Sequence, residues 1–391
     1  MSTRREFLLR SGQGLASLAV LPAAALFPGS AQGPLTSKTP SPAAVSLDDK
    51  IGQMVLAGFR GMKLDPGNPI LADIRERHIG GVVLFDYDVP SQSPVRNIES
   101  PSQLKDLTEA LQEASLIPLL IAVDQEGGKV SRLKEKFGFP ATVSQQSLGT
   151  RNDPGATRKA AEETAKTLVG CGFNINFSPV VDLNVNPGNP VIGGRERSFS
   201  EDSAVVTEHA LEVIKAHHAR GILTTLKHFP GHGSSKDDSH LGFVDVTETW
   251  TRTELEPYEK IIAAGLCDSV MTAHIFNSKL DPSLPATLSR RIIEGLLRDE
   301  LHFEGVVISD DLQMKAISAR YGFKDAILLA IGAGVDILAF ANNSIFDPEV
   351  AASAIGIIRK AVYDGRIGEK RIDRSYARII QLKALLGKGV I

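Results

Sequence analysis

Residues 119–128 read LLIAVDQEGG, a short apolar run that ends in acidic and amide side chains followed by two glycines. Such a run is typical of a strand that is buried on both faces. Similar runs recur along the chain, separated by longer segments with a helical spacing of apolar residues. The runs are residues 55–59, 81–85, 119–124, 174–179, 223–228, 269–274, 306–310 and 335–340. Eight strands that alternate with helices predict an α/β protein built as a single (β/α)8 barrel of the TIM type, with an open doubly wound sheet as the alternative.

The composition is that of an ordinary globular protein. The chain has 391 residues, of which 42% are hydrophobic and 23% are charged, and its formal net charge is −3. This charge gives nucleic acid no basic surface to bind, so we expect no nucleic-acid partner. We also expect the protein to be a monomer. Cys171 and Cys267 lie in mixed apolar segments, which favours buried free thiols over a disulfide.

The first 31 residues have the features of an export signal. Residues 3–8, TRREFL, place two arginines before an apolar run at 14–27, and small residues follow at 29–31. This order predicts a twin-arginine signal peptide over 1–31 and therefore a periplasmic or secreted protein. A membrane anchor is the weaker interpretation because Pro22 interrupts a run that is already short for a bilayer, so we expect no stable membrane span after signal removal.

A folded domain is predicted to follow a flexible linker. Residues 32–45 are rich in glycine, serine, proline, threonine and alanine, which is typical of a flexible tether. Ser46 with Asp49 three residues later predicts a helix start, so the domain is expected to cover 46–391. Near its end, the apolar side chains recur at helical spacing and predict an outer helix that closes the barrel. These are Ile372, Tyr376, Ile379, Ile380 and Leu386.

Polar side chains follow several of the predicted strands at the point where each strand ends. They lie in the sequences DQEGG at 124–128, KH at 227–228, TAH at 272–274 and SDD at 309–311. Active sites of such barrels lie at the carboxyl ends of the strands. The sequence therefore predicts a catalytic or binding rim at that end of the barrel.

The longest polar segment follows the fifth predicted strand and reads KHFPGHGSSKDDSH at 227–240. Gly231 and Gly233 allow backbone angles that let this segment fold back over the barrel mouth. Asp238 stands two residues before His240, so its carboxylate can orient the imidazole and raise its basicity. This pair is the candidate for proton transfer.

The seventh predicted strand ends in Asp310, which a barrel strand would hold rigidly at the mouth, as a nucleophile requires. Its neighbour Asp311 is expected to point elsewhere and to cap a helix that opens at Leu312. Two weaker interpretations of the polar residues remain. A metal could bind to histidines together with Asp238 or Asp310, although neither a zinc-helix motif nor a Cys/His spacing occurs. Those histidines are His228, His232, His240 and His274. Alternatively, Lys227 could form a Schiff base.

These motifs, taken in order, resemble glycoside hydrolase family 3 in its β-N-acetylglucosaminidase branch. The matching pieces are IGQM at 51–54, VDQEGG at 123–128, the segment 227–240, MTAH at 271–274, PATLS at 285–289 and SDDL at 309–312. The resemblance covers essentially the whole predicted domain, and the segment 227–240 marks the branch that takes its acid/base from this loop. The sequence departs from the pattern at Ser234, Ser235 and Lys236, where many members have an acidic residue.

The resemblance implies a retaining β-N-acetylhexosaminidase that acts on terminal sugars and needs no metal or cofactor. Asp310 would form the covalent glycosyl-enzyme intermediate, His240 would act as acid and then base, and Asp238 would hold His240. The sugar would be bound by Asp124, Arg132, Arg197, Lys227 and His228. The segment 193–199 carries a second arginine, so Arg195 is the alternative to Arg197 as the sugar contact.

The implied partners are saccharides that contain N-acetylglucosamine, either peptidoglycan fragments or chitooligosaccharides. A β-glucosidase or a phosphorylase of the same family, and a sugar-binding barrel without turnover, are the alternative functions. Histidine suits the acid/base role because its pKa of about 6.5 lies close to working pH, whereas most retaining glycosidases use two carboxylates.

Overall fold

The structure is a computed structural model that describes residues 45–386. The predicted signal peptide, 1–31, and all of the predicted linker except residue 45 lie outside the described residues. No helix within the described part of the chain is long and apolar enough to cross a membrane.

Eight parallel strands form one continuous sheet, in the order β10-β1-β2-β3-β4-β5-β7-β9. Each strand falls within a run predicted from the sequence, or extends it by one residue. The strands are β1 Val55–Gly58, β2 Gly81–Val83, β3 Leu120–Val123, β4 Ile175–Asn176, β5 Leu223–Phe229, β7 Ser269–Thr272, β9 Val306–Ile308 and β10 Leu338–Phe340. Their residues are buried throughout, as expected for strands that are covered on both faces.

The two ends of the sheet meet and close the ring. Ile308 at the end of β9 bridges in parallel to Ile337, next to β10. The backbone N–H of Ser309 donates to the carbonyl of Ile337 at 2.9 Å, and that of Asp336 donates to Val307 at 2.8 Å. The predicted TIM-type barrel is therefore confirmed, and the open doubly wound sheet is excluded.

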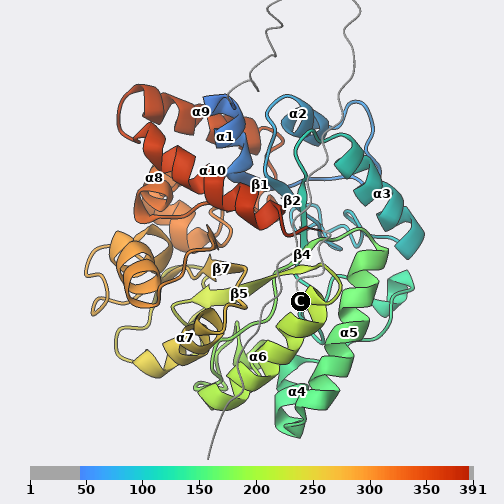
Figure 1. Ribbon diagram of the computed structural model, residues 1–391, viewed down its shortest axis with the longest axis vertical. Coiled ribbons are helices and arrows are strands. Elements are labelled where there is room, and N and C mark those ends of the chain that lie inside the picture. Colours follow the sequence, from blue (N-terminus) through green and yellow to red (C-terminus); the bar gives the residue numbers. More distant parts are fainter. Residues whose placement is uncertain (1–44, 387–391) are drawn as a thin grey trace, which may run out of the picture. The chain divides into compact units, whose positions relative to one another are not determined.

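Helices cover the outside of the ring (Figure 1). The α-helices are α1 Leu47–Gln53, α2 Pro69–Arg75, α3 Pro101–Glu113, α4 Gln145–Arg151, α5 Pro154–Gly170, α6 Ser203–His218, α7 Glu256–Ala263, α8 Lys315–Ala333, α9 Val350–Tyr363 and α10 Glu369–Lys383. Short 3₁₀ helices are η1 Glu135–Phe137, η2 Gly193–Arg195, η3 Arg252–Leu255 and η4 Ala286–Leu288. A π-helix, η5, covers Arg291–Glu300. Ser46 caps α1 in a capping box with Asp49, as predicted. The predicted outer helix near the end of the domain is α10, which packs against α1.

A small parallel sheet outside the ring was not expected from the sequence. It pairs β6, Val244–Asp245, with β8, Ile275–Phe276. β6 follows the polar segment 227–240, and β8 lies in the loop after β7. The pairing therefore attaches the far end of the polar segment to the loop after β7. The segment between β5 and β6 thus becomes a loop that is fixed at both of its ends.

The predicted role of Asp311 as a cap of a helix at Leu312 is wrong. α8 begins at Lys315, and its capping position is Met314. The carboxylate of Asp311 instead accepts the backbone N–H groups of Gln313 at 3.0 Å and Ala341 at 3.1 Å. It joins the loop after β9 to the loop after β10. Both cysteines are free thiols, as expected, but only Cys171 is buried, and Cys267 is partly exposed.

Candidate active site

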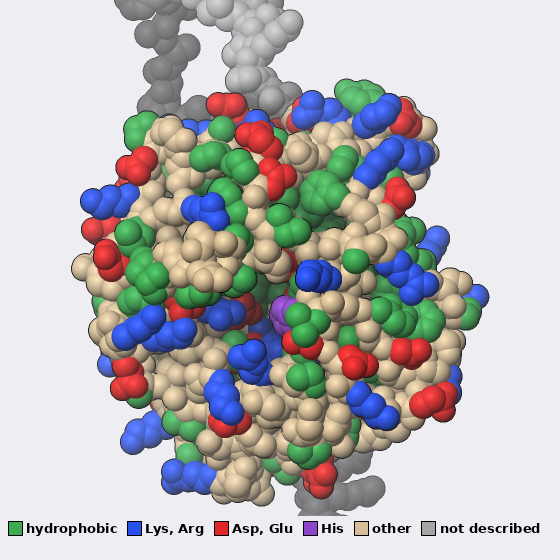
Figure 2. Space-filling model, turned by 180° about the vertical axis from the view of Figure 1, so that it is seen from behind, with side chains coloured by type: hydrophobic (Ala, Val, Ile, Leu, Met, Phe, Trp, Pro, Cys, Tyr) green, Lys and Arg blue, Asp and Glu red, His purple; other side chains and the backbone are tan. Residues whose placement is uncertain are grey.

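A pocket of about 460 Å³ opens at the carboxyl ends of the strands. Figure 2 shows this hollow, with a histidine at its edge and basic side chains around it. All of the predicted catalytic and sugar-binding residues line the pocket. They are Asp124, Arg132, Arg197, Lys227, His228, Asp238, His240 and Asp310. The structure therefore brings the predicted set together, while the role of each residue stays a prediction.

Alternating charges form the floor of the pocket. Lys227 is almost fully buried, and its Nζ lies 2.8 Å from Asp124 Oδ1 and 2.7 Å from Glu126 Oε1. Glu126 also accepts two hydrogen bonds from Arg197, both at 2.8 Å. Arg132 lies 3.5 Å from the other oxygen of Asp124. Each charged group is thus held by a partner of opposite sign before any ligand arrives.

Glu126 is the centre of this network, and sequence reasoning did not assign it a role. Burial alone would raise the pKa of its carboxyl group, but Arg197 and Lys227 outweigh burial and lower the pKa to about 2. Asp124 behaves similarly, because Lys227 and Arg132 outweigh its burial and hold its pKa below the ordinary value. Both carboxylates are therefore ionised at neutral pH.

Arg197 orients the ring of His228. Its guanidinium donates to His228 Nε2 at 3.1 Å, so Nδ1 carries the ring proton and donates to Asp182 at 2.7 Å. Arg195 also lines the pocket but is exposed. The buried network thus contains Arg197, which favours it over Arg195 as the sugar contact.

Asp182 anchors the start of the polar loop. It is fully buried and accepts the backbone N–H groups of His228 at 3.1 Å and His232 at 2.8 Å. Although burial opposes ionisation, these contacts and the imidazole of His228 lower the pKa of Asp182. The sequence carried a signal for it, since Asp182 ends the apolar pair Val180 and Val181 just after β4.

Asp310 follows β9, and one of its carboxylate oxygens accepts the backbone N–H of Asp311 at 2.8 Å. Burial would raise the pKa of Asp310, but the imidazoles of His274, His228 and His240 outweigh it and hold the pKa below its usual value. His274 is itself fixed, because its Nε2 donates to the carbonyl of Asp311 at 2.9 Å. The carboxylate of Asp310 is thus ionised and rigidly placed, as a nucleophile must be.

The loop brings Asp238 and His240 to the same pocket. Asp238 Oδ1 accepts both the backbone N–H of His240 and its ring Nδ1–H, each at 2.8 Å. This contact leaves Nε2 of His240 as the ring atom without a partner among the described residues. Burial opposes ionisation of Asp238, but the hydrogen bonds from His240 outweigh it and keep the pKa of Asp238 below the ordinary value. The pair has the geometry of an oriented general acid/base.

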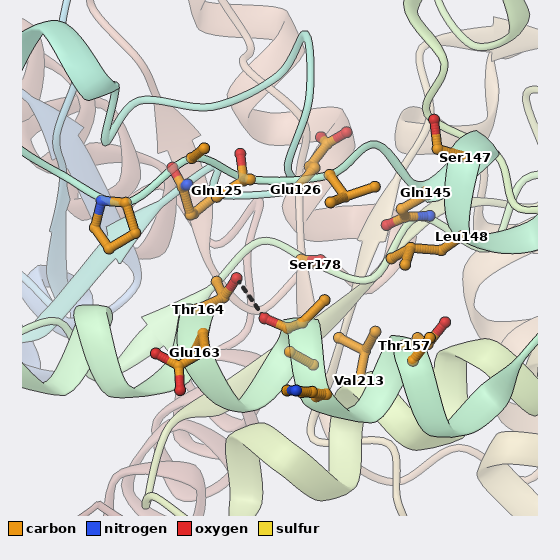
Figure 3. Close-up of a pocket in the computed structure, with 18 of the residues that line it drawn as sticks. Gln125, Glu126, Gln145, Ser147, Leu148, Thr157, Glu163, Thr164, Ser178 and Val213 are labelled. Carbon is orange, nitrogen blue, oxygen red and sulfur yellow. Dashed lines mark hydrogen bonds between the residues drawn. The ribbon is translucent and has the colours of Figure 1, made fainter.

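A larger pocket of about 810 Å³ lies between α5 and the segment 125–148 (Figure 3). It reaches Gln125 and Glu126 but contains none of the predicted catalytic or sugar-binding residues. Figure 3 shows Thr164 of α5 on the side of Gln125 and Thr157 of α5 on the side of Gln145 and Leu148. The smaller pocket holds all of the predicted catalytic residues and is therefore the candidate active site.

The geometry does not favour the Schiff-base interpretation of Lys227. Lys227 donates to two carboxylates, so its ammonium group serves as an ion-pair partner and not as a free amine. Within residues 45–386, no group of three or more histidine, cysteine or acidic side chains is placed to hold a metal ion.

The amino-acid sequence of the barrel matches a known family model. Residues 46–382 match the glycosyl hydrolase family 3 N-terminal domain. The chain belongs to glycosyl hydrolase family 3. The resemblance read from the sequence motifs is therefore confirmed, and the match covers nearly all of the described barrel.

Individual relatives agree with the family match. The chain is 37% identical over 342 residues to β-hexosaminidase A of Pseudoalteromonas piscicida, covering 81% of this chain and 55% of that protein. It is 36% identical to a β-hexosaminidase of Xylella fastidiosa (strain M23), covering 81% of this chain and 95% of that protein.

Among solved structures, a family 3 β-N-acetylglucosaminidase of Paenibacillus sp. str. FPU-7 superimposes with a TM-score of 0.80 at 38% identity. The superposition covers 88% of this chain and 63% of that one. The chain thus spans about half to two thirds of its longer relatives, and it spans nearly all of the shorter Xylella fastidiosa protein. These findings confirm the prediction of a family 3 glycoside hydrolase, and the relatives named above are β-hexosaminidases.

Proposed function

We propose that the protein is a retaining exo-β-N-acetylhexosaminidase that releases terminal N-acetyl-β-D-glucosamine through a covalent glycosyl-enzyme intermediate. The observation that carries the proposal is the single pocket in which the ionised carboxylate of Asp310 and the Asp238–His240 pair both lie. One group can attack the sugar while the other exchanges protons with the departing oxygen.

The reaction would proceed in two balanced steps. First, the Asp310 carboxylate attacks the anomeric carbon, and the bond to the leaving oxygen breaks as His240 Nε2–H gives that oxygen its proton. In the second step His240, now neutral, takes a proton from water, and the resulting hydroxide displaces Asp310 from the sugar. Asp238 holds the ring through Nδ1 at 2.8 Å, so that Nε2 faces the reaction in both steps.

The floor of the pocket supports sugar recognition. Asp124, Arg132 and Lys227 offer donors and acceptors that are already held in place, so a hydroxyl can join the network with little reorganisation. Arg197 and His228 add polar groups on the side of the polar loop. Such an array suits one terminal sugar, and a volume of about 460 Å³ suits one or two rings.

The substrate class follows from this size and from the predicted export. With a single tryptophan in the chain, a long stacked polysaccharide groove is not expected, which favours short oligosaccharides. Peptidoglycan fragments and chitooligosaccharides both meet this description. The predicted twin-arginine signal would place the reaction in the periplasm or outside the cell.

The decisive experiment uses His240→Ala and two leaving groups. An aryl N-acetyl-β-glucosaminide with a nitrophenolate leaving group needs little protonation, whereas the alkoxide that departs from chitobiose needs much. The variant should keep far more activity on the aryl substrate and show a burst of phenolate followed by a slow phase that azide accelerates. Asp238→Asn should give a milder form of the same pattern.

An equal loss of activity on both substrates, without a burst or an azide effect, would exclude His240 as the acid/base. Assaying the wild-type enzyme on an aryl β-glucoside, and with and without phosphate, distinguishes the proposed activity from those of a β-glucosidase and a phosphorylase. No turnover of any of these substrates would favour a sugar-binding barrel.

A further inference from the structure

The base of the loop that carries His240 rests on a second buried carboxylate, Glu254, which lies in η3. Glu254 is 1% exposed, and its Oε2 accepts the backbone N–H of Gly233 at 2.9 Å. The two residues are 21 positions apart in the chain. Trp250 contributes a further contact from the same region, because its ring N–H donates to the carbonyl of Pro230 at 2.9 Å.

The loop is shaped to approach Glu254 closely. Gly231 has a φ of +118°, and a Cβ at this position would lie 2.6 Å from the Cβ of Glu254. Only glycine allows both this backbone angle and this distance. The segment Pro-Gly-His-Gly at 230–233 therefore packs directly onto the side chain of Glu254. The glycine at 231 serves both the turn of the backbone and this close contact.

A continuous set of contacts leads from Glu254 to the acid/base. Gly233 follows His232, whose buried imidazole lies 3.2 Å from the hydroxyl of Ser239. Ser239 stands between Asp238 and His240 in the chain. The other ring nitrogen of His232 contacts Ser235 at 2.5 Å, and burial lowers the pKa of His232 to about 4. A neutral ring with two hydroxyl partners can hold Ser239 in a fixed position.

Glu254 has no other task that the described structure shows. Its second oxygen, Oε1, is buried without a hydrogen-bond partner among the described residues. Burial raises the pKa of Glu254 to about 7, together with the carboxylate of Asp182 and against the opposing contributions of Ser234 and Gly233 in the loop. A buried acid with an unpaired oxygen is destabilising. Its presence beside the loop therefore points to a use in holding that loop.

We propose that Glu254 is a positioning residue for the reaction: by holding Gly233, and through His232 and Ser239, it fixes the place of His240 over the pocket. This inference rests on the proposed function, because it assumes that His240 moves the proton. Glu254 itself does not touch the sugar, since it does not line the pocket. It acts only through the backbone of the loop.

The test compares Glu254→Leu, which removes the acceptor, with Glu254→Gln, which keeps an acceptor oxygen but loses the charge. Glu254→Leu should lower kcat on chitobiose about tenfold more than kcat on the aryl substrate, because a displaced acid harms the poor leaving group most. KM for the aryl substrate should change little. Glu254→Gln should restore the wild-type ratio, since the amide oxygen can still accept the N–H of Gly233.

Controls separate positioning from general damage to the fold. Glu256→Gln changes a carboxylate two residues away that contacts Ser203 and not the loop, and it should leave both activities unchanged. If Glu254→Leu does not fold, Glu254→Asp keeps the buried charge, withdraws it from Gly233 by one methylene and should show the same selective loss. Ser239→Ala removes the link to His232 and should do likewise.

The outcomes are distinguishable from failure of the proposed function. If His240→Ala discriminates between the two leaving groups but Glu254→Leu or Glu254→Asp lowers both activities equally, Glu254 is merely structural and the inference is overturned. The same conclusion follows if Glu254→Gln fails to restore the ratio. If His240→Ala itself does not discriminate, the proposed acid/base and the inference fall together.

Discussion

Replacing Glu126 by glutamine removes the negative charge that both Lys227 and Arg197 contact, at 2.7 and 2.8 Å. Lys227 and Arg197 would then remain buried with less negative charge beside them, and this loss should destabilise the barrel. The lowering of the Glu126 pKa from 4.5 to about 2 corresponds to about 3 kcal/mol in favour of the folded protein. Breaking a buried ion pair costs about 3–5 kcal/mol, which is of the same size.

The measurement is chemical denaturation of the wild type and of Glu126→Gln between pH 3 and pH 8. A carboxyl group whose pKa is lowered by folding stabilises the protein above its unfolded value, and this contribution is lost as pH falls through the folded value. The difference in the free energy of unfolding should therefore be constant, at about 3 kcal/mol, from pH 8 to 5, and should shrink below about pH 4.5. KM for the aryl substrate should also rise, because Lys227 and Arg197 lose their fixed positions.

Glu109→Gln provides the control, since Glu109 forms an exposed pair with Lys105 on α3 and should hardly matter. A difference for Glu126→Gln of less than about 1 kcal/mol, or one that does not depend on pH, would refute the reasoning, because it would mean that solvent or rearrangement already compensates the two cations.

Three further predictions follow from the site and from the opposite end of the barrel. Asp310→Ala should lower turnover by more than about a thousandfold while binding of N-acetylglucosamine, measured by calorimetry, survives; wild-type-like turnover would exclude Asp310 as the nucleophile. Prolonged chelation should leave activity unchanged, and a loss that zinc restores would favour the metal interpretation. Burial lowers the pKa of Lys383 to about 7, so the folded state holds this proton less tightly than the unfolded state. Relative to Lys383→Met, the wild type should therefore gain stability in chemical denaturation as pH rises from 7 to 10, and parallel curves would contradict this.

The strands could be predicted because each is a short run buried on both faces, and that pattern is local in the sequence. Asp124, Lys227 and Asp310 could be placed in one pocket for a related reason. Each stands at the end of such a run, and parallel strands of a barrel end on the same side. The prediction therefore needed the count and direction of the strands, and no knowledge of their contacts.

Glu126 and Glu254 could not be assigned in this way. Glu126 gains its importance from Arg197, which is 71 residues away, and Glu254 gains its importance from a loop 21 residues away. In the sequence, Glu254 has the pattern of an acid at the start of a helix. Asp311 was misassigned for the same reason, because a capping acid and an acid that joins two loops have the same local pattern.

The two ends of the described barrel lie beside each other, with α1 next to α10 (Figure 1). β1 pairs with β10, Lys50 of α1 donates to Asp373 of α10 at 2.6 Å, and Lys383 donates to Gln53 at 2.6 Å. A short peptide could join these ends, and the chain could then be opened in another outer loop without breaking any strand pair. Such a circular permutant should form the same pocket although its strands follow one another along the chain from a different starting point. The order of the eight units along the chain is thus separable from the chemistry that they build.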